Sequence, residues 1–323
     1  MVVAYRTVSW VLRHVPERPA AAIIGLGAQL SYLAWPTKRR WSNANFGHVL
    51  GLPPDHPRVR RLALRAYGAY GRYLVELMRL PTLRPEQAAA LVRPEQLAPM
   101  EPIWRESKGG LIFTAGHVGN NDAVAASGAG RGWPVSVVAD DSAYPDLYED
   151  FRRVRESWGV RLIPWRNLRE IYGVLRRREM LVLLVDWGYR PDGIPVRLFD
   201  AWTTLPAGPA TLAAKSGARI LPVSVRRGET GFEIGLAEPI EVTSADPGEL
   251  VRATQAMADA LADAIRAAPE QWYSFKPIWP EMAEEQAALE ARARAALAGQ
   301  GPAIGAPEHD GTEGRGQAAA AAS

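Results

Sequence analysis

The middle of this chain, from about residue 109 to 268, alternates short runs of apolar and β-branched residues with helical stretches. Such alternation is typical of β-α-β units, in which parallel strands pair in one sheet and helices cover it. It predicts an α/β fold with a mixed, largely parallel sheet flanked by helices. The strand candidates are Leu111–Ala115, Val135–Ala139, Val160–Pro164, Leu181–Asp186, Val196–Phe199, Ile220–Val225 and Phe232–Leu236. The helix candidates are Tyr144–Trp158, Leu168–Arg177, Gly208–Ser216 and Ala253–Ala268.

Residues 1–80 differ from the rest of the chain in charge and in pattern. They hold 12 Lys+Arg and 3 Asp+Glu, a net charge of +9, whereas the remaining residues hold 26 and 32, a net charge of −6. Val59–Leu80 places apolar residues at helical spacing, with arginines on its other faces. The pattern predicts a basic, amphipathic helical region that faces an anionic partner. No nucleic-acid-binding motif accompanies the charge, so an anionic membrane is favoured over nucleic acid.

The apolar run between Pro19 and Pro36 is the candidate membrane contact. Arg18 precedes it, and Lys38-Arg39-Arg40 follows it. A membrane-spanning helix needs about 20 apolar residues, and this run is shorter and is interrupted by two polar side chains. It predicts a helix that lies in the membrane interface, between charged flanks. A helix in the protein core is the alternative interpretation.

Length and composition fit one large folded unit. With 323 residues, of which 47% are hydrophobic, the chain can bury a large core. We expect residues 1–80 and 81–280 to form one globular unit, a helix over 281–298, and a disordered low-complexity tail over 299–323. The chain has no cysteine, which excludes disulfides, thiolate metal sites and cysteine nucleophiles. Its five histidines lie far apart without metal-binding spacing, so no metal is expected.

One histidine directly follows a strand candidate. Leu111–Ala115 ends at Gly116, His117 comes next, and Asp122 follows five positions later. Histidine can accept a proton near neutral pH, and a neighbouring carboxylate fixes its tautomer and stabilises its cation. The two side chains can meet only if residues 118–121 form a turn into a helix, which Gly and Asn favour. The pattern therefore predicts a strand, a catalytic turn and a helix.

Three further segments carry candidate site residues. Asp186 ends an apolar strand candidate, and a glycine-containing loop with Arg190 follows it, where sites of α/β proteins collect. Gly208 and Pro209 open a helix with small residues whose backbone can approach a ligand closely. The aromatic segment Pro269–Lys276 is predicted to pack over the core as a lid. Taken singly, each segment also fits an ordinary structural role.

In their order along the chain, these segments resemble the bacterial late acyltransferases of lipid A biosynthesis and the related phosphatidylinositol mannoside acyltransferases. The resemblance covers about residues 1–280 and includes the basic N-terminal region. Arg155 matches, less specifically, an arginine near the active site of this family. The matching motifs are His117/Asp122, Asp186 with Gly188 and Arg190, Val196-Arg-Leu-Phe-Asp200, Pro206-Ala-Gly-Pro209, Ser216-Gly-Ala-Arg-Ile-Leu-Pro-Val223 and Pro269-Glu-Gln-Trp272.

The resemblance implies transfer of a fatty acyl group from acyl-CoA or acyl-carrier protein to a hydroxyl of a membrane glycolipid or phosphoglycolipid, with no further cofactor. In this interpretation His117 is the general base and Asp122 orients it. Arg155 and Arg190 would bind phosphates of the acceptor or the donor. The substrate-binding candidates are Arg155, Asp186, Arg190, Gly208 and Pro209. We expect a monomer, peripheral or monotopic, on the cytoplasmic face of the bacterial plasma membrane.

Two departures from the family pattern bear on the acceptor. Leu198-Phe199-Asp200 stands where Phe-Phe-Gly is usual, and Asp140-Asp141 is acidic where a basic or neutral residue is common. The carboxylate after His117 is an aspartate, as in the mannoside branch of the family. This last feature favours a phosphoglycolipid acceptor.

Three other functions stay open at this point. A glycerol-phosphate acyltransferase shares the His-x4-Asp motif, but normally adds a Phe-Pro-Glu-Gly-Thr-Arg-like block that is absent here. A thioesterase or lipid hydrolase would use His117 to activate water instead of a lipid hydroxyl. A lipid-binding protein without catalytic activity would not turn over any acyl donor.

Overall fold

The computed structural model describes residues 2–141, 145–229 and 231–300. Its helices are α1 Val2–His14, α2 Glu17–Ala34, α3 Pro36–Leu50, α4 Pro57–Arg79, α5 Pro85–Ala89, α6 Pro94–Leu97, α7 Met100–Glu106, α8 Asn121–Ala129, α9 Pro145–Glu156, α10 Leu168–Arg176, α11 Gly208–Ser216, α12 Pro247–Ala267 and α13 Ala283–Leu297, with 3-10 turns η1 Leu80–Thr82 and η2 Pro269–Gln271. Its strands are β1 Leu111–Ala115, β2 Val135–Ala139, β3 Arg161–Pro164, β4 Met180–Leu184, β5 Ile194–Leu198, β6 Ala201–Leu205, β7 Arg219–Gly228 and β8 Gly231–Leu236.

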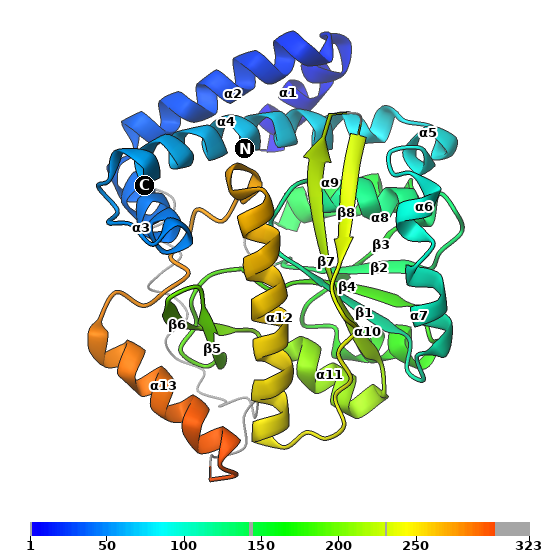
Figure 1. The fold of residues 1–323 in the computed structure, drawn as a ribbon. Coiled ribbons are helices and arrows are strands. Elements are labelled where there is room, and N and C mark those ends of the chain that lie inside the picture. The colour runs from blue at the N-terminus through cyan, green and yellow to red at the C-terminus, as the bar shows by residue number, and fades with distance from the viewer. Residues whose placement is uncertain (1, 142–144, 230, 301–323) are drawn as a thin grey trace.

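Six of these strands form one twisted sheet in the order β3-β2-β4-β1-β7-β8 (Figure 1). All neighbouring pairs are parallel except β7 and β8, which are antiparallel. The expected α/β fold with a mixed, largely parallel sheet is therefore confirmed. The expected strand over Val196–Phe199 is different: as β5 it pairs antiparallel with β6 in a separate hairpin. The sequence interpretation missed β6, which follows β5 after the two-residue turn Phe199-Asp200.

Helices cover both faces of the sheet, because the chain reverses its direction of travel across the strands. From β1 to β2 to β3 it moves toward one edge, and α8 and α9 lie on one face. It then returns through α10 to β4 and through α11 to β7, so these two crossover helices lie on the other face, as right-handed crossovers require, and α12 packs beside α11. Each face has its own buried core. Members of the first include Phe113, Ala126 and Trp158, and members of the second include Ile112, Ile171 and Met257.

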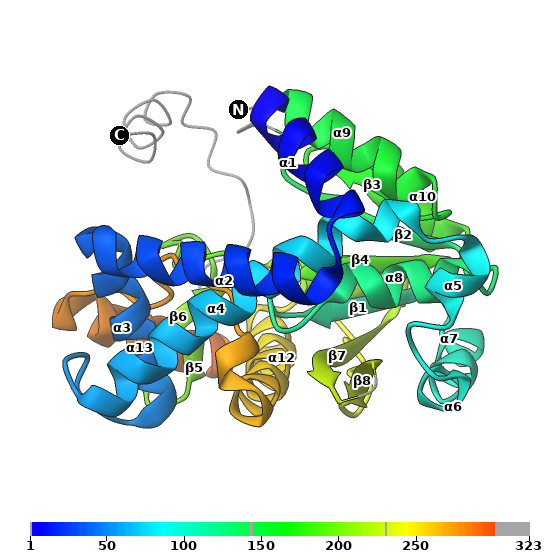
Figure 2. The same ribbon diagram turned by 90° about the horizontal axis from the view of Figure 1, so that it is seen from above.

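The N-terminal helices lie across one side of this domain. Figure 2 shows α2 resting along α4, with α1 turned toward α9, and Arg6 on α1 forms a salt bridge of 2.8 Å with Asp150 on α9. The α2–α4 crossing is close, since a Cβ on Gly71 would lie 2.6 Å from the Cα of Gly25. Within the described residues, no helix has the length and apolar character needed to cross a membrane.

Two expectations concern the end of the chain. The helix expected over 281–298 corresponds to α13, which packs against α12 and the β5–β6 hairpin (Figure 1). The tail expected to be disordered lies outside the described residues from position 301 onward, as does Tyr144, the first residue of the helix expected before β3.

Candidate active site

The pairing of β1 with β4 brings two polar residues together at the carboxyl edge of the sheet. In this parallel pair Ala115 lies opposite Leu184. His117 comes two residues after Ala115, and Asp186 comes two residues after Leu184. Apart from the buried Thr114 both strands are apolar, and the first polar side chains beyond them meet where the strands end and loops begin.

His117 and Asp186 form a hydrogen-bonded pair. Nδ1 of His117 lies 2.6 Å from Oδ1 of Asp186. The backbone N–H of His117 also donates to the same carboxylate, at 3.0 and 2.9 Å from its two oxygens. The Asp186 side chain is fully buried, whereas the His117 side chain is 30% exposed. The carboxylate is therefore a support behind the ring, and the ring faces the space where a substrate can reach it.

The carboxylate fixes which ring nitrogen of His117 carries the proton. Because Asp186 accepts from Nδ1–H, the free nitrogen Nε2 is the one that can accept a proton from a substrate. Burial lowers the pKa of His117, but the charge and hydrogen bond of Asp186 outweigh it, so the pKa is raised above 6.5. Burial raises the pKa of Asp186, but the charge of His117 and the hydrogen bonds from His117 and Trp272 hold it below 3.8.

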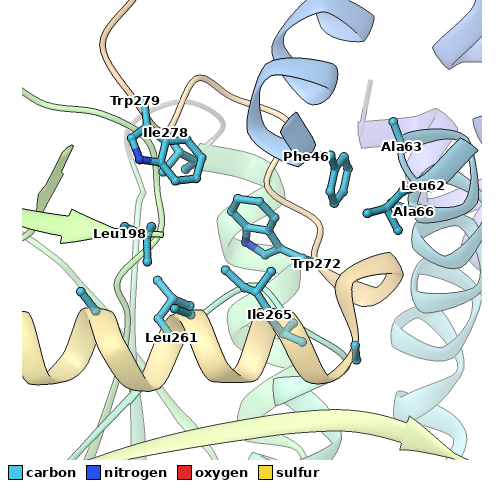
Figure 3. Packing of buried hydrophobic residues seen from close by; sticks show 14 of the residues in the cluster. Phe46, Leu62, Ala63, Ala66, Leu198, Leu261, Ile265, Trp272, Ile278 and Trp279 are labelled. Carbon is cyan, nitrogen blue, oxygen red and sulfur yellow. The ribbon is translucent and has the colours of Figure 1, made fainter. Parts of the chain in front are cut away.

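A tryptophan completes the environment of Asp186. Nε1–H of Trp272 donates to Oδ2 of Asp186 at 2.8 Å. The indole is fully buried and packs between Phe46 on one side and Leu261 and Ile265 of α12 on the other (Figure 3). Such packing fixes the position of the N–H, and with it the orientation of the carboxylate.

The segment around Trp272 also holds the backbone of the turn that carries His117. Tyr273 N–H donates to the carbonyl of His117 at 2.8 Å, and Gly119 N–H donates to the carbonyl of Gln271 at 2.9 Å. Gly119 has a φ of +64°, and a Cβ there would lie 2.3 Å from the Val225 carbonyl oxygen. The aromatic segment packs over the core as expected, through Trp272 and Phe275, and it also acts as a clamp on the histidine turn.

Asp122 was expected to orient His117, but its carboxylate pairs with Arg155 instead. Asp122 lies in the first turn of α8, and its Oδ1 accepts a 2.7 Å hydrogen bond from Nε of Arg155 on α9. Asp186 is the carboxylate that contacts Nδ1 of His117, the orienting role that was expected of Asp122. Asp122 is still close enough that its charge helps to raise the pKa of His117. The turn and the helix are as expected, because Asn120 caps α8 by accepting from Ala123 N–H at 3.0 Å.

The structure places the other candidates differently. The side chain of Arg155 is 15% exposed and pairs with Asp122, which places it near the pair of His117 and Asp186, called the dyad below. Arg190 lies in the loop after Asp186, and its exposed guanidinium pairs with Asp192. Gly208 and Pro209 start α11, where Pro209 is buried and a Cβ on Gly208 would meet no heavy atom within 4 Å. Asp186, expected to bind substrate, is buried behind the histidine and cannot touch one.

The space behind the histidine turn is mainly apolar. A cavity of about 250 Å³ lies between β1, β7, β8 and α12, next to Gly116 and Val185. Its apolar lining includes Met257 and Leu261 of α12. No group of three or more His, Asp or Glu side chains suited to hold a metal ion occurs among residues 2–141, 145–229 and 231–300.

Comparison with known proteins identifies the group of enzymes to which this site belongs. Residues 1–281 match the family described as bacterial lipid A biosynthesis acyltransferase. A phosphatidylinositol mannoside acyltransferase of Mycolicibacterium smegmatis is 27% identical over 277 residues, which cover 83% of this chain and 88% of that protein. The enzyme of the same name from Mycobacterium tuberculosis is 27% identical over 298 residues, covering 90% of this chain and 92% of that protein. With a match across most of its length, and with a histidine held by a buried aspartate at its sheet edge, the chain belongs to the bacterial lipid A biosynthesis acyltransferase family and is an acyl-transferring enzyme.

Proposed function

We propose that this enzyme transfers a fatty acyl chain from a thioester, acyl-CoA or acyl-carrier protein, to a hydroxyl of a membrane phosphoglycolipid, with His117 as general base. The observation that carries this proposal is the buried Asp186 carboxylate at 2.6 Å from Nδ1 of a partly exposed His117. A sugar hydroxyl is a poor nucleophile until a base removes its proton, and such a base contributes typically about 10²–10⁴-fold to the rate.

The proposed reaction needs no covalent acyl-enzyme. Nε2 of His117 takes the hydroxyl proton while the hydroxyl oxygen attacks the thioester carbon, and Asp186 stabilises the imidazolium that forms. The C–S bond then breaks, and the imidazolium returns its proton to the leaving thiolate. The chain has no cysteine to carry an acyl group. Direct transfer to the acceptor therefore uses only groups that the site provides.

The phosphoglycolipid acceptor is supported by the names of the relatives, which are phosphatidylinositol mannoside acyltransferases. The aspartate in the His-x4-Asp motif and the apolar cavity behind the turn also fit an acyl reaction on a lipid. The test is product analysis by mass spectrometry with acyl-CoA, with and without phosphatidylinositol mannoside. We expect acylated glycolipid that forms only when acceptor is present. Free fatty acid released at the same rate without acceptor would show a thioesterase instead.

We propose further that α1 and α2 bind a membrane surface, on the cytoplasmic side where acyl thioesters are available. Exposed apolar side chains on α2 recur at helical spacing, and more lie on α1. We call this set the apolar stripe: Val8, Trp10, Val11, Ile23, Leu26, Leu30, Leu33 and Trp35. Arg18 and Lys38-Arg39-Arg40 flank it. Apolar side chains that face water on a basic helix are the pattern of a helix that lies in the membrane interface.

Replacing Leu26 and Leu30 together with glutamate should weaken binding to anionic vesicles at least tenfold, because burial of each leucine contributes about 1.5–3 kcal/mol and each 1.4 kcal/mol is tenfold. The measurement is cosedimentation with vesicles that contain anionic lipid. Leu297→Glu on α13 is the matched control, since Leu297 is 61% exposed against 58% and 56% for the two stripe residues. Binding of the wild type should also weaken with added salt. Equal binding by the double variant and the control would contradict the assignment.

A further inference from the structure

We propose that Lys38 and Lys276 form a phosphate-binding site at the mouth of the active site, which holds a phosphate of the substrate while His117 acts on the hydroxyl. The proposal rests on the proposed function, and it adds the residues that select a phosphate-bearing substrate. The sequence contains only four lysines, at positions 38, 108, 215 and 276. Lys276 lies close enough to His117 for its charge to act on the ring, and Lys38 acts in turn on Lys276.

Lys276 reaches the site from the clamp on the histidine turn. Its Nζ lies 3.9 Å from the ring centroid of Trp187, and the Trp187 ring centroid lies 6.0 Å from that of His117. Trp187 is the residue after Asp186 in the chain and is half exposed. The ammonium is therefore held next to an aromatic ring that borders the catalytic histidine. A single lipid headgroup can therefore contact both the Lys276 ammonium and His117.

Lys38 lies near the start of α3, and its charge acts on the Lys276 ammonium. Its Nζ lies 4.7 Å from the ring centroid of Trp41 and 5.9 Å from that of Trp35. Trp35 is the last member of the apolar stripe. Burial lowers the pKa of Lys276, and the like charge of Lys38 lowers it further. Two ammonium groups whose charges repel each other are an arrangement that a bound anion stabilises.

The two lysines are available to bind the anion of a substrate, because neither is neutralised by a carboxylate in the described parts of the protein. Among the described residues, neither Lys38 nor Lys276 forms a salt bridge, and the acidic group that acts on Lys276 is Asp140 at the end of β2. The arginines first expected to bind phosphate already pair with carboxylates: Arg155 with Asp122, and Arg190 with Asp192. The lysines are thus the cations best placed to meet a phosphate near the dyad.

The position explains how a lipid would present its hydroxyl. The apolar stripe leads through Trp35 to Lys38, then to Lys276 and Trp187, and finally to His117. A phospholipid whose tails lie in the membrane beside α2 would bring its phosphate to the lysines, and its headgroup hydroxyls to the histidine. The phosphates of acyl-CoA could occupy the same site, and the experiment below distinguishes a phosphate of the lipid acceptor from a phosphate of the acyl donor.

The experiment compares Lys276→Gln, Lys38→Gln and the double variant with Lys108→Gln in neutral detergent micelles, which remove membrane electrostatics. Lys108 is the matched control, because it is an exposed lysine before β1, at the opposite end of that strand from His117. A charge-assisted hydrogen bond contributes enough that KM should rise about tenfold for Lys276→Gln. We expect this rise for phosphatidylinositol mannoside and no rise for a mannosyl diacylglycerol, which has no phosphate. Lys276→Arg should retain most of the affinity.

Donor comparison shows which substrate supplies the phosphate. If the KM of acyl-CoA rises in Lys276→Gln while that of acyl-pantetheine does not, the site binds donor phosphates. Equal KM changes with phosphate-bearing and phosphate-free substrates, or no difference from Lys108→Gln, would overturn the proposal.

A binding measurement separates failure of this inference from failure of the proposed function. Inositol 1-phosphate is titrated by calorimetry into wild type, Lys276→Gln and Lys108→Gln, without any acyl donor. We expect binding to weaken about tenfold in Lys276→Gln alone, whatever reaction the enzyme performs. Equal affinity in all three proteins would sink the phosphate site, even if acyl transfer to the glycolipid is observed.

Discussion

Replacing His117 with alanine should lower kcat for acyl transfer by about 10²–10⁴-fold, because the hydroxyl of the acceptor loses the base that takes its proton. His117→Gln should be as inactive, although glutamine can still hydrogen-bond to Asp186 and keep the carboxylate satisfied. The KM values of donor and acceptor should change little, since the ring acts mainly in the transition state. The measurement is steady-state transfer of a labelled acyl chain from acyl-CoA to the glycolipid.

The fold of both variants should be intact, which circular dichroism and a thermal melt check. The backbone N–H of His117 and the indole N–H of Trp272 still donate to Asp186 after the ring is removed. The buried carboxylate therefore keeps hydrogen-bond partners. Full transfer activity in a folded His117→Ala protein would exclude His117 as the base.

Asp186→Asn should have the second-largest effect, a loss of about 10²–10⁴-fold. An asparagine NH₂ facing Nδ1 would favour the tautomer with its proton on Nε2, which cannot accept the substrate proton; the corresponding change in serine proteases lowers kcat about 10⁴-fold. Asp122→Asn should cost about tenfold or less, because Asp122 pairs with Arg155 and acts on His117 only at a distance. A larger loss in Asp122→Asn than in Asp186→Asn would reverse the assignment.

The pH profile gives Asp186→Asn a second readout. The pKa of His117 is raised by Asp186, and only the neutral ring can accept a proton. In the wild type kcat/KM should therefore rise with pH through an apparent pKa above 6.5, the ordinary value for histidine. Without the carboxylate charge that pKa falls, so the residual activity of Asp186→Asn should reach its plateau at lower pH.

The sheet and the position of His117 in a turn after β1 were open to prediction from local sequence. Apolar runs that end at Gly116 or before Asp186 show where strands stop, and Asn120 shows where α8 begins. These signals depend on residues that are neighbours in the chain. The hairpin strand β6 was missed because Ala201–Leu205 follows β5 after only two residues, Phe199 and Asp200, and neither is a glycine or asparagine that would mark a tight turn.

The partner of His117 could not be read from spacing, because it depends on strand order. His117 and Asp186 are 69 positions apart and meet only because β4 is the neighbour of β1. Asp122 is close in the chain, but α8 directs it toward Arg155. Trp272 was missed as a support of the site for the same reason. One signal was available: a charged residue at the end of an apolar strand, such as Asp186, is costly to bury without a partner.

In the proposed mechanism His117 and Asp186 act as one unit, and the double variant His117→Ala/Asp186→Asn tests this most directly. Residues of one catalytic unit have strongly non-additive effects, because the second loss removes nothing that the first has left. We predict that kcat/KM of the double variant equals that of His117→Ala within about twofold. If the two separate losses multiply instead, the residues act independently and the dyad is contradicted.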